Sequence, residues 1–210
     1  MEKQITLKNN LKLTLNCNVS AEGFYINAVY NNKSVGMCQF HIFNVFAQKM
    51  TKKKQEMYAK MHKIPLVNCP KNLELQIDVF GSDNKVKTLF PTDDIVEFQN
   101  PDYTIEENVL TFNSGGKYNY SHTICELIRI EILDEQFSHI GLGYEMLKFM
   151  EEIANEFNAE KIQALFMPNG NLFHASMQFY KRNGFTFTKR NDKLLYLEKT
   201  LQKTNKKDLD

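Results

Sequence analysis

The sequence predicts an α/β (α+β) fold, in which a mixed, mostly antiparallel central sheet is flanked by helices and carries a β-rich insertion before the central strand. Three observations predict it. Residues 24–30 and 35–43 alternate between apolar and polar side chains on either side of a polar turn. A strand-like segment starting at Ile128 leads through a glycine-containing loop into an amphipathic run at 144–157. Between these parts, several short strand-like pieces occupy more chain than a plain connection needs.

The N-terminal part is predicted to form antiparallel strands. Two short apolar segments, 5–7 and 11–15, lie around an Asn9-Asn10 turn and form either one strand or a small hairpin. The alternating segments at 24–30 and 35–43 follow as a clearer hairpin. These strands would precede the strand at Ile128 in the sheet.

The insertion is expected at about residues 44–120. Its first part, 44–62, has apolar residues at helical spacing and many lysines, which predicts a helix that Pro65 ends. We expect the lysines to form a solvated face, and contact with nucleic acid or with the phosphates of a cofactor is the alternative. Strand-like pieces follow at 73–80, 86–90, 95–98 and 109–112. Residues 1–201 would then be one domain, and the charged tail 202–210 would be frayed.

The most informative local pattern is a strand, a glycine loop and a helix in direct succession. Ile128, Ile130 and Ile132 occupy alternate positions, as one face of a strand requires. Gly141 and Gly143 follow in the loop, and glycine lets a ligand approach the backbone closely. The free N–H groups of the helix's first turn, aided by the helix dipole, favour an anion. A diphosphate is the ligand that such a loop is expected to bind.

A second motif follows this loop. A short strand at 162–167 and a polar break at 168–171 lead into a helical run that ends Phe179-Tyr180-Lys181-Arg182-Asn183-Gly184-Phe185, before a last hairpin. Together with the Gly-x-Gly loop, it resembles the acyl-CoA-binding half of the GNAT superfamily of N-acetyltransferases over roughly residues 124–199. That family shows (Q/R)-x-x-G-x-(G/A) at a strand-to-helix turn and (F/L)-Y-x-(K/R)-x-G-F at the end of the later helix.

The sequence departs from the family pattern in three places. Ser138 stands where the family has Gln or Arg. Asn171 is the nearest match to the family's asparagine before the later helix, at a longer spacing from Tyr180 than usual. The family places two helices between its first two strands, where only residues 18–23 are available here. In the family, those helices form the wall of the acceptor site. The structure of that site can therefore not be transferred to this chain.

The resemblance implies acetyl-CoA as co-substrate, with no metal. The cofactor-binding residues would then be Leu133, Ser138, His139, Ile140, Gly141, Leu142, Gly143 and Asn171. In this arrangement the loop holds the diphosphate, and the backbone N–H of Leu133 polarises the thioester carbonyl. The proton donor to the leaving thiolate falls on Tyr180, with an aromatic cover over the helix end as its structural alternative.

A general base is assigned from strand parity. Glu131 shares a strand face with Arg129 and Leu133, which is the face expected to meet the thioester. Glu126 has the opposite parity unless a bulge intervenes. Glu131 is therefore the candidate base, and an ion pair with a neighbouring Lys or Arg is the alternative role for its carboxylate.

Composition narrows the class of protein. A hydrophobic content of 42% in 210 residues suffices for a core, and a net charge of +1 argues against nucleic acid or an acidic membrane as partner. The four cysteines lack a C-x-x-C pair, so neither a zinc site nor a disulfide framework is indicated. No signal peptide or membrane-spanning run is evident, and a cytoplasmic protein is expected. The oligomeric state stays open, and a dimer is compatible with the sequence.

The preferred function is an N-acetyltransferase that moves an acetyl group from acetyl-CoA to a primary amine of a small molecule or of a protein or peptide. Two alternatives remain. The Ser138 position and the asparagine spacing would suit a degenerate module that binds acyl-CoA or a partner without catalysis. The lysine-rich predicted helix would suit an acetyltransferase acting on aminoacyl-tRNA. The identity of the amine substrate is not encoded in the fold.

Overall fold

The computed structural model describes residues 1–20, 22–61, 63–80, 86–89, 95–98, 102–166, 173–189 and 195–202. The chain divides into two compact units. The first comprises Met1–Ile42 with Thr123–Asp210, and the second comprises Phe43–His122. That the second unit is an insertion into a single domain stays a prediction.

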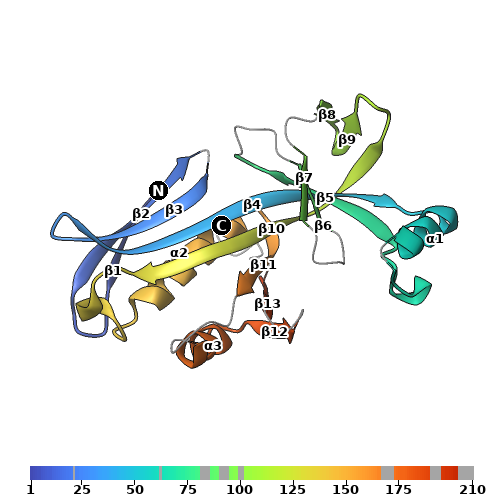
Figure 1. Ribbon diagram of the computed structural model, residues 1–210. Helices are drawn as coiled ribbons and strands as arrows, with labels where there is room; N and C mark the ends of the chain where they lie inside the picture. Colours follow the sequence, from blue (N-terminus) through green and yellow to red (C-terminus); the bar gives the residue numbers. More distant parts are fainter. Residues whose placement is uncertain are drawn as a thin grey trace. The chain divides into compact units, whose positions relative to one another are not determined.

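The first unit is built on a mixed, mostly antiparallel sheet, which confirms the predicted fold class. Its strand order is β1-β2-β3-β4-β10-β11-β13-β12 (Figure 1). β10 and β11 run parallel, whereas the β1–β2, β2–β3, β3–β4, β11–β13 and β12–β13 pairs are antiparallel. The strands are β1 (Glu2–Thr6), β2 (Lys12–Ser20), β3 (Gly23–Tyr30), β4 (Lys33–Lys49), β10 (Lys117–Ile132), β11 (Ala159–Phe166), β12 (Thr186–Lys189) and β13 (Leu195–Thr200).

Helix α2 (Leu142–Glu156) forms because its apolar residues recur at helical spacing, as the sequence predicted for 144–157. Its buried face includes Met146, Leu147, Met150 and Ile153. On its outer side, Glu152 pairs with Lys3 of β1 and Glu151 pairs with Lys199 of β13. Both sides of the helix therefore tie it to the sheet.

The contact between α2 and β4 is close because β4 carries a glycine there. A Cβ at Gly36 would lie 3.1 Å from Leu142 Cδ2, 3.2 Å from Met146 Cε and 3.3 Å from the carbonyl oxygen of Glu131. Those distances are shorter than ordinary carbon contacts, so no larger residue fits without movement. The first turn of α2 is thereby seated on β4.

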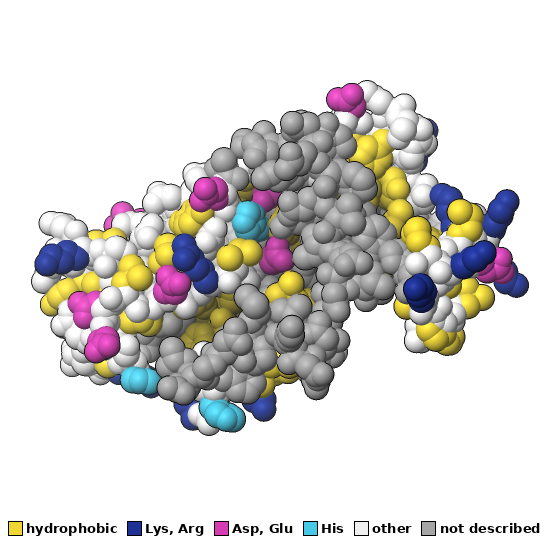
Figure 2. All heavy atoms as spheres, viewed as in Figure 1, with side chains coloured by type: hydrophobic (Ala, Val, Ile, Leu, Met, Phe, Trp, Pro, Cys, Tyr) yellow, Lys and Arg dark blue, Asp and Glu magenta, His cyan; other side chains and the backbone are white. Residues whose placement is uncertain are grey.

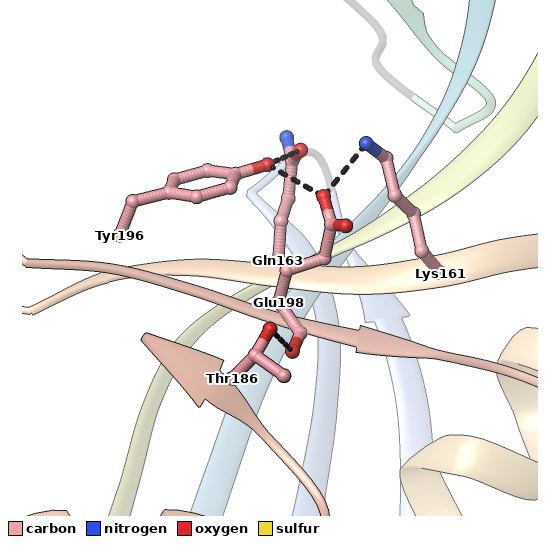
Figure 3. A network of polar contacts seen from close by, with 5 residues as sticks. All are labelled: Lys161, Gln163, Thr186, Tyr196 and Glu198. Atoms are coloured by element: carbon pink, nitrogen blue, oxygen red, sulfur yellow. Dashed lines mark hydrogen bonds and ion pairs between the residues drawn. The ribbon is translucent and has the colours of Figure 1, made fainter. Parts of the chain in front are cut away.

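The C-terminal hairpin is held to β11 by polar side chains (Figure 3). Lys161 Nζ lies 2.8 Å from Glu198 Oε2, and the Tyr196 hydroxyl donates to Gln163 Oε1 at 2.7 Å. The Thr186 hydroxyl donates to the Glu198 carbonyl at 3.0 Å. Gln163 is buried, so satisfying its amide matters for stability. The three strands β11, β13 and β12 consequently act as one block.

The second unit contains the end of β4, the start of β10 and helix α1 (Lys52–Met61). It also holds η1 (Leu66–Asn68), β5 (Asn72–Asp78), β6 (Val86–Leu89), β7 (Ile95–Phe98), β8 (Tyr103–Glu106) and β9 (Val109–Phe112). Phe46, Leu75, Ile77, Val86 and Leu110 form its buried core. The predicted strands at 73–80, 86–90, 95–98 and 109–112 are confirmed within a few residues, and β8 was missed.

The helix predicted over 44–62 is wrong in its first part. β4 continues through Lys49, and Phe43–Lys49 pair antiparallel with β5. Val45 and Phe46 are buried in this strand, so a short apolar run that fits either period was settled by sheet pairing. α1 takes up only Lys52–Met61, and its lysines lie at the surface, as Figure 2 shows.

We expect Gly36→Val to lower the free energy of unfolding by about 2 kcal/mol, because the added methyl groups overpack the contact between β4 and α2. Urea unfolding followed by circular dichroism measures the change. Ser34→Val, at an exposed position of the same strand, is the control. Equal stability of the two variants would mean that α2 does not depend on this close approach.

Candidate functional site

The loop between β10 and α2 is anchored before it reaches the glycines. A short 3₁₀ turn, η2 (Glu135–Phe137), is capped by Asp134, whose carboxylate accepts from the Gln136 N–H at 3.1 Å. Phe137 is fully buried and packs edge-on against Tyr30, with ring centroids 5.4 Å apart. The residues that follow are therefore held at a fixed place on the sheet.

The glycine loop presents backbone N–H groups at the start of α2. Gly141 has φ of +100°, a left-handed conformation in which a side chain would be strained, and a Cβ there would meet nothing within 4 Å. The Gly141 carbonyl accepts from the Glu145 N–H at 3.1 Å, so the helix begins at Leu142. The first-turn N–H groups have no acceptor within the helix. They suit an anion.

Gly143 has a different role from Gly141. A Cβ on Gly143 would lie 3.4 Å from Cε2 of Phe179, on helix α3 (Phe173–Arg182). Its missing side chain therefore lets α3 pack beside the first turn of α2. This contact brings Tyr180, the next residue of α3, to the same region as the loop.

A pocket of about 830 Å³ lies between these parts of the first unit. The loop forms one wall, α3 forms another, and the end of β10 and the segment after β1 complete it. Its lining residues are Thr6, Leu7, Lys8, Ile130, Ile132, Phe137, Ser138, His139, Ile140, Gly141, Leu142, Gly143, Tyr144, Glu145, Ala175, Ser176, Gln178, Phe179, Tyr180, Arg182 and Asn183. The structure thus brings the six predicted loop residues and Tyr180 together.

The end of β10 leaves β11 and supplies a backbone edge. The parallel pairing runs from Thr123 to Glu126, while β10 continues to Ile132. Along the rest of β10, no partner strand on the β11 side is found among the described residues. Ile130 and Ile132, which belong to this part, line the pocket instead.

The predicted role of the Leu133 N–H is wrong. This group donates to the carbonyl of Val35 at 2.9 Å, so it faces β4 and has no hydrogen left for a second acceptor. The Glu131 carbonyl, next to Gly36, faces the same way. Because N–H groups alternate between the two edges of a strand, those of Ile130 and Ile132 face the opposite edge. The parity of the N–H groups at this edge of β10 therefore differs from the predicted one.

Tyr180 is partly buried and sits among aromatic rings. Its ring packs edge-on against Phe179 and Phe185, with centroids 5.2 Å and 5.3 Å apart. Burial, and to a lesser extent the charge that Cys38 would carry as a thiolate, raise the pKa of Tyr180 to about 12. At neutral pH the side chain is therefore a protonated phenol, which can donate a proton and cannot accept one.

Glu131 does not line this pocket. Its carboxylate lies 3.5 Å from the Arg129 guanidinium, and both side chains are nearly half exposed. The ion pair that the sequence offered as an alternative is therefore formed. A role for Glu131 as general base stays a prediction.

Some sequence predictions fall on residues that the structure does not describe. Asn171 lies outside the described residues, as do residues 203–210 of the predicted tail. Among the described residues, no helix separates the strands from β1 to β4, in agreement with the short connection noted in the sequence. Sequence reasoning missed the segment Thr6–Lys8 as part of the pocket, because no local pattern links it to a loop so distant along the chain.

Comparisons with known proteins find similar folds and no close relative. No protein-family model matches the sequence, and no curated protein is significantly similar to it. Among solved structures, the PaiA N-acetyltransferase from Thermoplasma acidophilum in complex with coenzyme A has 12% identity and a TM-score of 0.39, covering 84% of this chain and 59% of that one. The GNAT domain of S. lividans PAT has 9% identity and a TM-score of 0.48, covering 95% and 97%.

A GNAT-family acetyltransferase from Staphylococcus aureus Mu50 is also similar, with 13% identity, a TM-score of 0.33 and coverage of 75% and 99%. The fold class that the sequence predicts, a mostly antiparallel sheet with a strand, a glycine loop and a helix in succession, is present in the structure.

The described residues show neither a membrane-spanning helix nor a cluster of metal ligands. No helix within the described ranges is long and apolar enough to cross a membrane. In the same ranges, no three His, Cys, Asp or Glu side chains gather as a metal ion would require. All four cysteines are free thiols, and Cys17, Cys38 and Cys125 are buried.

The raised pKa of Tyr180 predicts a pH dependence of stability. Between about pH 10 and the folded-state value of about 12, the unfolded chain has lost the phenolic proton while the folded chain keeps it. The free energy of unfolding therefore falls as pH rises through this window, by up to about 1.4 kcal/mol per pH unit from this group. Tyr180→Phe should remove that part of the slope.

Urea unfolding at several pH values from about 9 to 12 measures the slope for both proteins. Tyr144→Phe, which removes an exposed phenol from α2, is the matched control. Identical slopes for the wild type and Tyr180→Phe would show that the Tyr180 phenol is not shielded from water in the folded state.

Proposed function

We propose that this protein transfers an acetyl group from acetyl-CoA to a primary amine. One observation carries the proposal: the N–H groups at the start of α2, the exposed edge of β10 and the protonated phenol of Tyr180 all border one pocket. An acyl transfer from a thioester needs these three functions, namely an anion cradle, a donor to the carbonyl oxygen and an acid for the departing sulfur.

The pocket suits such a co-substrate. The loop is open at Gly141, where even a Cβ would touch nothing, so phosphate oxygens can approach the backbone. The N–H groups of residues 139–143 and the dipole of α2 would hold the diphosphate. The volume of about 830 Å³ accommodates the pantetheine arm in addition. When bound, acetyl-CoA supplies an activated thioester.

The exposed edge of β10 would orient the thioester. The N–H of Ile132 replaces that of Leu133 as the proposed donor to the carbonyl oxygen, and Ile130 offers backbone groups to the amides of the pantetheine arm. A fixed donor of this kind stabilises the charge that develops on the oxygen during amine attack, by about 3 kcal/mol. Holding the amine beside the thioester carbon accounts for much of the remaining rate.

Tyr180 would act when the carbon–sulfur bond breaks. The phenol donates its proton to the leaving thiolate, and the proton that the attacking nitrogen releases restores the phenol through water. The proton count is thereby balanced, with free thiol and an amide as products. The raised pKa keeps the phenol protonated at neutral pH, so a proton donor is present when the sulfur departs.

The acceptor is a primary amine of a small molecule or of a protein or peptide. A degenerate module that binds acyl-CoA without catalysis is the first alternative, supported by Ser138 in place of the family's Gln or Arg. An enzyme acting on aminoacyl-tRNA is the second, supported by the lysines of α1. RNA binding that weakens with salt and is lost on neutralising Lys52, Lys53 and Lys54 would favour the second alternative.

Release of free thiol from acetyl-CoA, measured against a panel of amines, polyamines, aminoglycosides and peptides, tests the proposal. Amine-dependent release establishes the activity and its acceptor class together. Binding of acetyl-CoA by calorimetry without consumption by any amine would favour the non-catalytic module. No binding at all would remove the proposed function.

We expect Tyr180→Phe to lower kcat by about a hundredfold, because the thiolate would have to leave without its proton donor. The affinity for acetyl-CoA should barely change, since the ring and its packing are retained. Steady-state thiol release and calorimetry measure the two quantities. Unchanged turnover would exclude Tyr180 from the mechanism.

For Glu131→Gln we expect a loss in kcat/KM of less than about threefold, because its carboxylate is screened and paired with Arg129 outside the pocket wall. The pH profile of kcat/KM gives a second measurement. A loss near that of Tyr180→Phe, together with disappearance of the acidic limb of the profile, would establish Glu131 as the base instead.

A further inference from the structure

The segment that follows β1 forms part of the pocket wall beside the glycine loop. Thr6, Leu7 and Lys8 line the pocket, and the backbone N–H of Lys8 donates to the carbonyl of Ile140 at 3.4 Å. Ile140 belongs to the loop proposed to hold the diphosphate. A residue from the start of the chain is thus placed directly against that loop.

The segment is held firmly in this position. Leu7 is 4% exposed, and its backbone N–H donates to the Leu11 carbonyl at 2.9 Å. The Leu7 carbonyl in turn accepts from the Asn10 N–H at 2.9 Å, which closes the turn into β2. Lys8 therefore projects from an ordered turn, and its backbone needs no rearrangement to stay beside the loop.

The charges on the pocket wall favour an anion. Lys8 and Arg182 are its lysine and arginine residues, and Glu145 is its carboxylate. Lys8 is exposed, and within the part of the chain that the structure describes no carboxylate forms an ion pair with it. The loop itself carries Ser138 at the position where a Gln or Arg was expected. Its own side chains therefore bring no permanent positive charge.

We propose that Lys8 binds the diphosphate of coenzyme A together with the backbone N–H groups of the glycine loop, and so supplies the positive charge that the loop lacks. The inference rests on the proposed function. A lysine is suited to this task because its ammonium ion is a compact charge on a flexible stem. Fixed N–H groups position the phosphates, and the ammonium neutralises them.

Calorimetry with coenzyme A on three variants tests this assignment. Lys8→Gln should weaken binding by about tenfold, with a smaller loss at high salt, because one charge-assisted contact is removed and salt screens it. Lys8→Arg should bind within about threefold of the wild type, since the charge is retained. Lys12→Gln, an exposed position on the neighbouring β2, is the matched control and should leave binding unchanged.

Dephospho-coenzyme A, which keeps the diphosphate and lacks the 3′-phosphate, locates the contact. The loss on Lys8→Gln should be the same for both ligands. A loss seen only with coenzyme A would overturn the diphosphate assignment in favour of the 3′-phosphate. Equal binding by Lys8→Gln and Lys12→Gln would refute the role of Lys8 while leaving the proposed function intact, whereas a wild type that binds neither ligand would remove both.

Discussion

The close seat of α2 on β4 at Gly36 is the constraint on which the candidate site depends. Leu142 is at once the first residue of α2, the residue after the left-handed Gly141, and one of the two side chains that press on Gly36. The packing of a buried contact therefore fixes the position of the helix N-terminus. The ion pairs of Lys3 with Glu152 and of Lys199 with Glu151 connect the helix to β1 and β13. Packing and polar contacts thus determine where the first-turn N–H groups of α2 lie.

A second constraint separates the strands. β10 is paired with β11 only over Thr123–Glu126, and beyond that point its edge borders the pocket. β11 is kept with β13 and β12 through a continuous antiparallel ladder and the network around Glu198 (Figure 3). The unpaired N–H and C=O groups of a strand edge usually allow another strand to pair with it. Here it lies beside a cavity, where an extended ligand with its own amide groups can occupy it.

Much of the fold was predictable because its signals are local. Alternation gave the hairpin of β3 and β4, and helical spacing gave α2 nearly to its ends. The helix predicted from 44 failed because Val45 and Phe46 fit both periods, and only pairing with β5, a non-local event, decides between them. The site shows the same division. Gly141 and Tyr180 came from motifs, whereas the parity of Leu133 and the proximity of Lys8 depend on contacts that no local spacing encodes.

The proposed mechanism assigns some tasks to backbone N–H groups and others to side chains. This division explains why the sequence can depart from the family pattern at Ser138. In the proposed mechanism, anion binding and carbonyl polarisation would fall to N–H groups, which any residue except proline supplies. Ser138 in place of Arg or Gln would then remove one contact and leave the cradle. Backbone conformation is more demanding, because the φ of +100° at Gly141 strongly favours glycine at that position. Proton donation alone requires a particular side chain. In the proposed mechanism, the protonated phenol of Tyr180 would give its proton to the departing thiolate, and the incoming ammonium group would be deprotonated elsewhere. The acceptor side must therefore supply its own base or bind the amine already neutral.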